Sequence, residues 1–163
     1  MRHKKRPDRA LRLDHFLPYR LSVLAAAVSR RFADEYEKSF GLTIPEWRVM
    51  AVLGFFKPMS SNRIVEHTSM DKAKVSRAVA RLVRRGLLTR RSHPEDGRLL
   101  VLGFSPKGRR IYRRIARLAK EWEAWLVAGL LADDRRRLAR TLGALTRRLH
   151  RDRTDGLFRR RGL

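Results

Sequence analysis

The side chains best suited to a chemical task in this sequence are cations on one predicted helix near its centre. Between Asp71 and Arg85, the spacing of Val75, Val79 and Leu82 predicts a helix with one apolar face. The opposite face carries short polar and basic side chains, which suit contacts with phosphates and base edges in a DNA groove. The candidate DNA-contacting residues of this face are Lys72, Lys74, Ser76, Arg77 and Arg81.

A second group of cations surrounds a predicted β-hairpin. Two short strands are expected at residues 87–91 and 99–103, joined by the loop at 93–97. An arginine on a projecting hairpin can enter a narrow minor groove, where the negative potential is enhanced. Asp96 lies two residues before Arg98 and can orient its guanidinium through a charge-assisted pair. The DNA-contacting candidates of this hairpin are Arg90, Arg91, Asp96 and Arg98.

The elements around these cations decide how they are interpreted. A short predicted helix at 62–67, a turn at 68–70 and the cationic helix after it are the parts of a helix-turn-helix. A solvated surface helix would have a similar composition. The preceding turn and the basic hairpin that follows favour DNA binding, with the hairpin acting as a wing.

Long apolar helices are predicted on both sides of this winged region. The first runs from about Asp14 to Ser39 and closes at Gly41, and a second begins at Thr43 with Pro45 and Glu46 in its first turn. Two more are expected from Ser105 and from Asp133. The fold class is therefore mainly α with a small β-hairpin wing: a winged helix-turn-helix domain plus a helical dimerisation region.

These helices also predict the domain layout. Residues 1–12 form a basic arm, 13–150 form the domain and 151–163 form a basic tail. Within the domain, residues 14–39 and 105–150 are the dimerisation helices, and 43–104 form the winged helix. The terminal helices are apolar yet separated by the whole winged region, so a monomer could not easily cover both. Two chains could cover them by forming a homodimer.

Composition limits the class of partner and excludes several kinds of site. The 163 residues include 40 Lys or Arg and 16 Asp or Glu, a formal net charge of +24. Such an imbalance calls for a polyanion, first nucleic acid and second an anionic membrane surface. The absence of Cys excludes disulfides, thiolate catalysis and Cys-type zinc sites. With five scattered His and few acids, we expect no enzyme, no metal and no cofactor. The sequence shows neither a signal peptide nor a membrane span, so we expect a cytoplasmic protein.

Three stretches together resemble the MarR family in order and spacing. They are LTIPEWRVMAVL, MDKAKVSRAVARLVRRGLLTRR and PEDGRLLVLGFSPKGR, and the resemblance covers about residues 14–149. It implies an obligate homodimer that places two winged domains on successive major grooves of a pseudo-palindromic operator. It also implies that Ser76 and Arg77 face the bases and that Arg98 is the wing arginine, with Asp96 as its partner. Gly97 departs from the family pattern, where a charged or bulkier residue is common.

Many MarR regulators are released from DNA by small aromatic acids, and the resemblance implies a pocket between the dimer helices and the winged domain. To bind an aromatic carboxylate, the protein would need an Arg or His beside the carboxylate group and a Trp or Tyr beside the aromatic ring. Trp47 and Arg48 also recur in the family as fold residues, and His67 could simply face solvent. The candidate ligand-binding residues are His15, Tyr19, Arg20, Trp47, Arg48, Arg63 and His67.

Two functions of different classes follow from these patterns. One is a sequence-specific transcription regulator, a repressor released by a small aromatic acid. The other is an architectural protein that binds duplex DNA with little sequence preference and has no effector. Short polar residues such as Ser76 beside Arg77 favour the first, and the ratio of specific to non-specific affinity at fixed salt separates the two.

Overall fold

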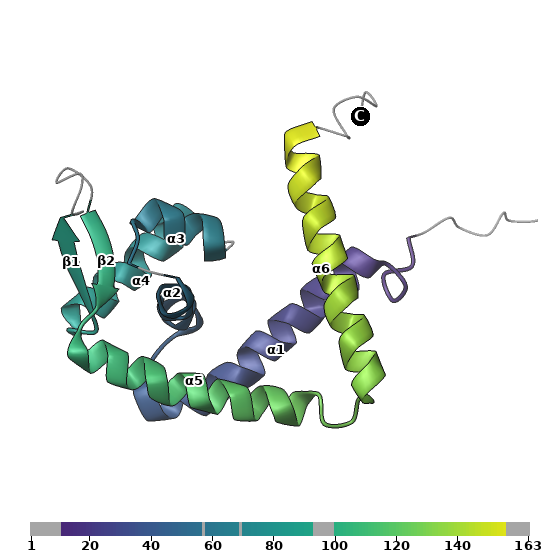
Figure 1. The fold of residues 1–163 in the computed structure, drawn as a ribbon, viewed down its shortest axis with the longest axis horizontal. Helices are drawn as coiled ribbons and strands as arrows, with labels where there is room; N and C mark the ends of the chain where they lie inside the picture. The colour runs from purple at the N-terminus through teal and green to yellow at the C-terminus, as the bar shows by residue number, and fades with distance from the viewer. Residues whose placement is uncertain (1–10, 57, 69, 93–99, 156–163) are drawn as a thin grey trace, which may run out of the picture. The chain divides into compact units, whose positions relative to one another are not determined.

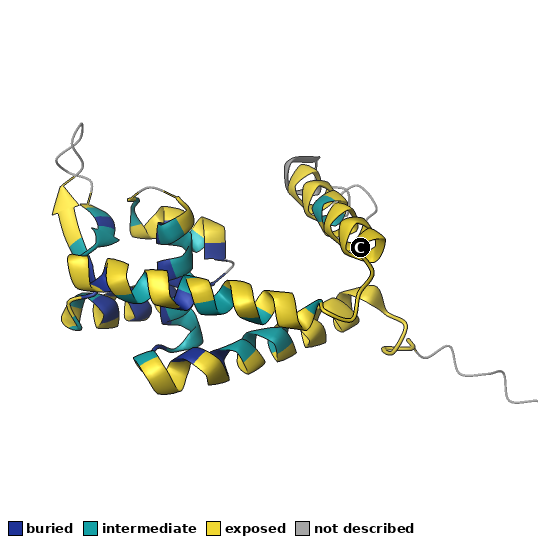
Figure 2. Ribbon diagram, turned by 60° about the horizontal axis from the view of Figure 1, so that its bottom comes forward, coloured by how far each residue is buried: buried dark blue, intermediate teal, exposed yellow. Residues whose placement is uncertain are grey.

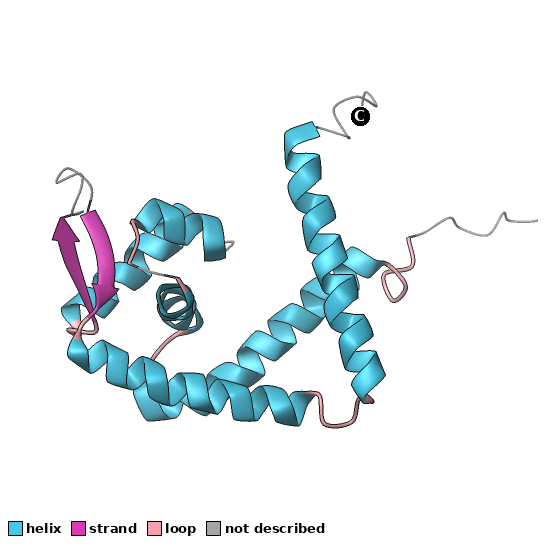
Figure 3. Cartoon of the chain, in the orientation of Figure 1, coloured by secondary structure: helices cyan, strands magenta, loops and turns pink. Residues whose placement is uncertain are grey.

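The fold is known from a computed structural model that describes residues 11–56, 58–68, 70–92 and 100–155, with the backbone alone for 152–155. Over these residues the chain forms six helices and one antiparallel hairpin (Figures 1 and 3), which confirms the predicted fold class. The elements are α1 (Leu17–Phe40), α2 (Ile44–Phe55), α3 (Ser61–Thr68), α4 (Lys72–Arg84), β1 (Leu88–Ser92), β2 (Leu100–Phe104), α5 (Pro106–Leu126) and α6 (Ala132–Asp155). They belong to two compact units, residues 1–119 and residues 120–163.

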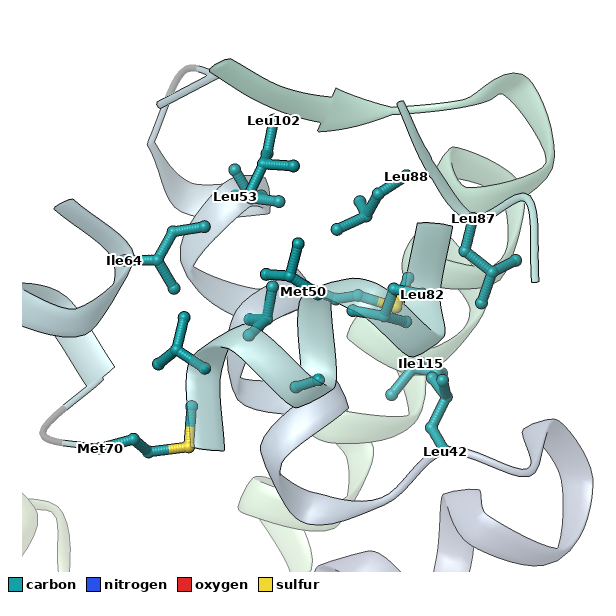
Figure 4. Close-up of a cluster of buried hydrophobic side chains, with 14 of the residues drawn as sticks. Leu42, Met50, Leu53, Ile64, Met70, Leu82, Leu87, Leu88, Leu102 and Ile115 are labelled. Carbon is teal, nitrogen blue, oxygen red and sulfur yellow. The ribbon is translucent and has the colours of Figure 1, made fainter. Parts of the chain in front are cut away.

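The first unit encloses a hydrophobic core between α2, α3, α4, the hairpin and the first half of α5 (Figure 4). Strands β1 and β2 pair from Leu88 opposite Phe104 to Ser92 opposite Leu100. Met59 adds a short bridge to Leu102 on the free edge of β2. The side chains that are almost wholly buried come from every one of these elements: Leu42, Met50, Ile64, Val75, Leu82, Leu87, Leu88 and Ile115.

The ends of the first two helices follow the sequence signals. Pro18 lies in the first turn of α1, and Gly41 ends this helix with φ 60° and ψ 31°, the left-handed conformation that glycine adopts without strain. At the start of α2, the backbone N–H and the hydroxyl of Thr43 both donate to a Glu46 carboxylate oxygen at 2.8 Å. Glu46 is buried, so these bonds satisfy a carboxylate that has left solvent.

Arg85, just after α4, fastens the C-terminus of α1 to the winged region. Its guanidinium donates to the carbonyls of Gly41 and Phe40, each at 2.7 Å. These carbonyls belong to the last turn of a helix, where no intrahelical donor remains and the helix dipole favours a cation. The joint therefore fixes where α1 leaves the core.

Ser105 joins the hairpin to α5. Its hydroxyl donates to the Gly86 carbonyl at 2.6 Å and accepts from the Gly108 N–H at 2.9 Å, while its backbone N–H donates to the Leu87 carbonyl at 3.1 Å. Gly108 lies so close to the backbone just before β1 that an added Cβ would be 1.9 Å from the Leu87 carbonyl oxygen. Only a residue without a side chain allows α5 to begin here.

Several boundaries differ from the predicted ones: α1 begins at Leu17 instead of about Asp14, and the strands lie at Leu88–Ser92 and Leu100–Phe104 instead of 87–91 and 99–103. Three further differences have a local cause or consequence. Asp71 precedes α4 as its N-cap and is not its first residue. Thr68, expected in the turn, ends α3 with its hydroxyl bonded to the Ile64 carbonyl at 2.8 Å. Helix α6 continues to Asp155, beyond the expected start of the tail at Arg151, because helix-compatible Arg and Asp residues follow with no Gly or Pro until Gly156.

Apolar side chains at the start of α1 and along α6 are exposed (Figure 2). Leu24 is 60% exposed and Leu149 is 68% exposed, and Trp125 at the end of α5 is 62% exposed. Exposed apolar residues at helical spacing indicate surfaces that another chain covers. This agrees with the expected dimerisation role of these helices, which stays a prediction.

Gly108 offers a direct test of the joint between hairpin and α5. We expect Gly108→Ala to lower the free energy of unfolding by about 1–3 kcal/mol, because a backbone carbonyl has to move to admit the new methyl group. The matched control is Gly143→Ala in α6, where an added Cβ lies 3.4 Å from the flexible Arg147 guanidinium. Gly143→Ala should raise the free energy of unfolding by about 0.5–1 kcal/mol, because alanine has a higher helix propensity than glycine. Urea denaturation at one protein concentration measures both, and equal effects would contradict the close contact.

Candidate nucleic-acid interface

Helix α4 presents a clean separation between an apolar and a cationic face. Val75, Ala78, Val79 and Leu82 are buried. The five predicted DNA-contacting residues of this helix, Lys72, Lys74, Ser76, Arg77 and Arg81, are all exposed. Because the buried positions recur every three or four residues, the exposed ones share the outward face. The structure thus brings these five candidates onto one surface.

The outward face of α4 is positively charged and poorly neutralised. Lys74 pairs with Asp71 across 3.1 Å, an exposed contact that contributes little energy. Arg77 and Arg81 form no ion pair among the residues that the structure describes, although the charge of Arg77 acts on Asp71. Unpaired arginines on a projecting helix are available to fork onto phosphates or guanine edges.

A small hollow beside α4 adds residues that sequence reasoning did not single out as neighbours. It has a volume of about 160 Å³ and is lined by Thr43, Pro45, Lys74, Arg77, Ala78 and Arg81. The start of α2 therefore lies against the cationic face of α4. Three cations around a hollow of this size suit one anionic group such as a backbone phosphate. The capping signal at Thr43 was visible in the sequence, but its proximity to Arg77 was not.

Asp71 sets the start of α4. One oxygen of its carboxylate accepts the backbone N–H of Lys74 at 2.7 Å, and the Lys74 ammonium lies beside the other. This backbone hydrogen bond, followed by the Lys74 side chain, holds the pKa of Asp71 below its ordinary value of 3.8. An ionised cap at this end also interacts favourably with the helix dipole.

Two of the four predicted wing residues lie on the described part of the hairpin. Arg90 and Arg91 are exposed on β1, opposite Leu102 and Val101 respectively. Since successive strand residues point to opposite faces, the two arginines extend to different sides of the hairpin. Asp96 and Arg98 lie outside the described residues, as does Gly97, and their roles stay predictions.

Two of the predicted ligand residues instead join α2 to neighbouring helices. The Trp47 ring lies 5.9 Å from Phe32, 5.8 Å from Tyr36 and 6.2 Å from Tyr112, measured between ring centroids. Arg48 donates to the Ser29 hydroxyl on α1 at 3.2 Å. Burial raises the pKa of the Tyr36 hydroxyl to about 12, with Glu37 adding to the shift and Arg48 opposing it. Trp47 and Arg48 thus have structural contacts whatever else they bind.

The other five ligand candidates fall into two groups, one on α3 and one near the start of α1. His67 stacks on Phe56 with centroids 4.2 Å apart, and Arg63 pairs with Glu66 at 3.1 Å. His15, Tyr19 and Arg20 are exposed near the start of α1. Tyr19 is ten residues before Ser29, or about 15 Å along the helix. Neither the hollow beside α4 nor a second hollow, lined by Pro58, Phe104 and Arg109 among others, is lined by any of the seven.

The described residues contain neither a metal-binding cluster nor a membrane-spanning helix. No group of three or more His, Cys, Asp or Glu side chains there could hold a metal ion. Among the helices described, none is both long enough and apolar enough to cross a membrane.

Comparisons with known proteins point to one family. The sequence profile of the MarR family matches residues 40–99. The HTH-type transcriptional repressor Mb2911 of Mycobacterium bovis is 26% identical over 131 residues, 80% of this chain and 91% of the repressor. A MarR/EmrR family transcriptional regulator from Acinetobacter sp. ADP1 shares the fold with a TM-score of 0.79 at 24% identity, over 86% of this chain and 99% of that one. PcaV of Streptomyces coelicolor, solved in complex with its natural ligand, is 25% identical with a TM-score of 0.67, over 86% and 96%.

The cap of α4 generates a pH prediction. At pH 7 we expect Asp71→Asn to melt at a lower temperature than the wild type, because the neutral amide loses the interaction of a negative charge with the helix N-terminus and cannot pair with Lys74. The folded state lowers this pKa, so the extra stability is present above the ordinary value of 3.8 and is lost as the pH falls through the folded value. The gap between the two melting curves should therefore close on acidification. The control is Asp133→Asn in the first turn of α6, which removes one acid from another helix. If the difference in melting temperature between Asp71→Asn and the wild type did not change with pH, the ionised carboxylate of Asp71 would not be the source of the stability.

Proposed function

Because this chain belongs to the MarR family of winged helix-turn-helix transcription regulators, which act by binding DNA operators and not as enzymes, we propose that it is a sequence-specific repressor released by a small aromatic acid. The observation that carries the DNA-binding part is the face of α4. Its unpaired Arg77 and Arg81 project from a helix whose other face is buried in the core.

In this proposal the exposed residues divide into readers and anchors. Ser76 and Arg77 contact base edges in the major groove, where an arginine can bind guanine through two hydrogen bonds. Phosphates are held by the remaining cations of the interface, which are Lys72, Lys74, Arg81, Arg90 and Arg91. Arg98, oriented by Asp96, enters the neighbouring minor groove. The hollow beside Thr43 supports phosphate binding by Lys74 and Arg81, which line one anion-sized space; Arg77 lines it too, so the assignment of Arg77 to the bases depends on the test below.

The proposed active form is a homodimer built from residues 14–39 and 105–150, with the winged helix at 43–104 reading DNA. The exposed apolar residues of α1 and α6 support it. Two recognition helices related by a two-fold axis meet successive major grooves, so half-site centres should lie about 10 base pairs apart in a pseudo-palindrome. The arm at 1–12 and the tail at 151–163 would add phosphate contacts.

The proposed effector is a small aromatic carboxylate bound where α1 meets α2. PcaV, a relative solved with its natural ligand, supports the binding of an effector. BpsR of Bordetella bronchiseptica, whose DNA binding is regulated by 6-hydroxynicotinic acid, supports an aromatic acid. Arg48, a half-buried cation that bridges these two helices, supports the location. The wide separation of His15, Tyr19 and Arg20 from Trp47, Arg63 and His67 means that one chain does not assemble all seven around a ligand. A pocket that uses both groups would need the second chain of the dimer.

An architectural role with little sequence preference is the second candidate, and the net charge of +24 favours it. Phosphate contacts supply most non-specific affinity and fall steeply with salt, so charge alone does not separate the two roles. The specificity ratio at one salt concentration does.

Selection from a random duplex library tests the proposal. We expect enrichment of a pseudo-palindrome, and Arg77→Ala should weaken binding to it by about 1–3 kcal/mol while relaxing the preference at one position in each half-site. Arg137→Ala on α6 removes the same charge and should leave the preference unchanged. Failure to enrich any sequence would favour the architectural role, and equal losses on selected and random DNA would make Arg77 a phosphate contact.

The effector makes a reciprocal prediction. An aromatic acid that releases DNA must bind the free protein more tightly than the DNA-bound protein, by the same factor that it weakens DNA binding. Calorimetric titration with salicylate or benzoate, with and without the selected duplex, measures both sides. Arg48→Ala should lower the affinity for the acid, whereas Arg30→Ala, an exposed neighbour on α1, should not. Equal affinity of the acid for both forms would overturn the mechanism.

A further inference from the structure

We propose that the outward face of α5 binds a second DNA duplex, so that the protein bridges two segments of DNA. We call this face the α5 ridge. It consists of seven cations, Lys107, Arg109, Arg110, Arg113, Arg114, Arg117 and Lys120. It lies on a different helix from the proposed operator-binding face, and the bridging rests on DNA binding at that face.

Burial defines the ridge sharply. Between Lys107 and Lys120, every exposed residue of α5 is Lys or Arg. The positions between them are buried or half-buried, among them Gly108, Ile111 and Ile115, which face the core. Since α4 packs its own apolar stripe into that same core, the outward faces of the two helices point away from it in different directions. Figure 1 shows α5 and α3 on opposite sides of α2, with β2 leading into the start of α5.

No acid neutralises this ridge within the described part of the chain. None of its seven cations forms an ion pair there, and the next acid along the helix is Glu121. Several of them lie three or four residues apart, as Arg110 does from Arg113 and Arg114. Like charges at these spacings destabilise a helix. A polyanion lying on the ridge would relieve this repulsion.

Three of the seven side chains are held in place by other contacts. The Lys107 ammonium donates to the Arg85 carbonyl at 3.3 Å. The Arg109 guanidinium lies over the Phe104 ring at 5.6 Å, and that of Arg114 lies over Phe40 at 5.0 Å, distances at which a cation and a ring attract. These anchors fix the edges of the ridge, and Arg110, Arg113 and Arg117 form its unanchored centre.

The chemistry of the ridge fits duplex DNA better than a membrane surface. An amphipathic helix binds a membrane by inserting its apolar face, and here that face is buried in the core. From Lys107 to Lys120 the helix rises about 20 Å. Along that length a duplex presents about one phosphate charge per 1.7 Å. No Ser, Thr, Asn or Gln is exposed between these residues. The ridge thus lacks the mixed polar and basic pattern of the α4 face, and we assign it to the phosphate backbone.

The test captures one duplex through another. A biotinylated 30-base-pair random duplex is fixed on beads, full-length protein is added, and capture of a fluorescent second duplex is measured at fixed salt. The ridge variant carries Arg110→Gln, Arg113→Gln and Arg117→Gln, which spare the three anchored cations. A matched control removes three exposed charges from α6 with Arg137→Gln, Arg140→Gln and Arg148→Gln, and a charge-conserving variant replaces the three ridge arginines with Lys. Circular dichroism melting confirms that each variant folds.

We expect the wild type, the α6 control and the Lys variant to capture the second duplex, and the ridge variant to capture at least five-fold less. Its affinity for a single short duplex carrying the selected site should stay within two-fold of the wild type. The inference is overturned if the wild type captures no second duplex, if the ridge variant captures as much as the wild type, or if the ridge and α6 variants lose capture equally. Failure of the proposed regulator function would appear instead as no enriched site in the selection, with capture unchanged.

Discussion

Burial of the apolar stripe of α4 is the constraint on which the rest of this structure depends. Val75, Val79 and Leu82 are at most 2% exposed. Burying a Val or Leu side chain contributes about 1.5–3 kcal/mol, so these positions strongly disfavour any rotation of the helix about its axis. The rotation that buries them also turns Lys72, Ser76, Arg77 and Arg81 to solvent. One hydrophobic interaction thus sets both the core and the cationic surface.

Two polar joints extend this control to the neighbouring helices. Arg85 bonds the last carbonyls of α1, and Ser105 connects the turn after α4 to the start of α5. The Lys107 ammonium bonds the Arg85 carbonyl, which links the joints to each other. In the first unit, the ends of α1 and α4 and the start of α5 therefore meet at one place. Gly41 and Gly108 are needed there because one adopts a left-handed backbone and the other leaves no room for a side chain.

Electrostatics oppose this compact arrangement. The ion pairs seen among the described residues are exposed, and such pairs contribute little to stability. A chain with a net charge of +24 repels itself when folded. Binding a polyanion lowers this repulsion. DNA that binds the folded protein should therefore also raise its free energy of unfolding. The α4 face and the α5 ridge carry much of this unpaired charge on two helices that bury their apolar residues in the same core.

Local patterns in the sequence were sufficient to predict the helices and the hairpin. Helical periodicity, Gly41, the Thr43–Glu46 cap and the strand signals identified every helix and the hairpin, with errors at boundaries. Asp71 was placed inside its helix because a cap differs from a first-turn residue only in backbone geometry. The end of α6 was missed because its polar residues carry no stop signal before Gly156.

The exposed face of α4 could also be predicted, because alternation between apolar and basic positions is itself a local pattern. Proximity between distant residues could not. The hollow that joins Thr43 to Arg77, and the dispersal of the proposed ligand residues, depend on how α1, α2 and α4 pack. The α5 ridge could not be predicted either. It is recognisable only from the burial of α5, which shows that every exposed residue from Lys107 to Lys120 is charged. Sequence determined which faces each helix has, and tertiary packing decided which of those faces meet, because periodicity along a chain contains no distances across it.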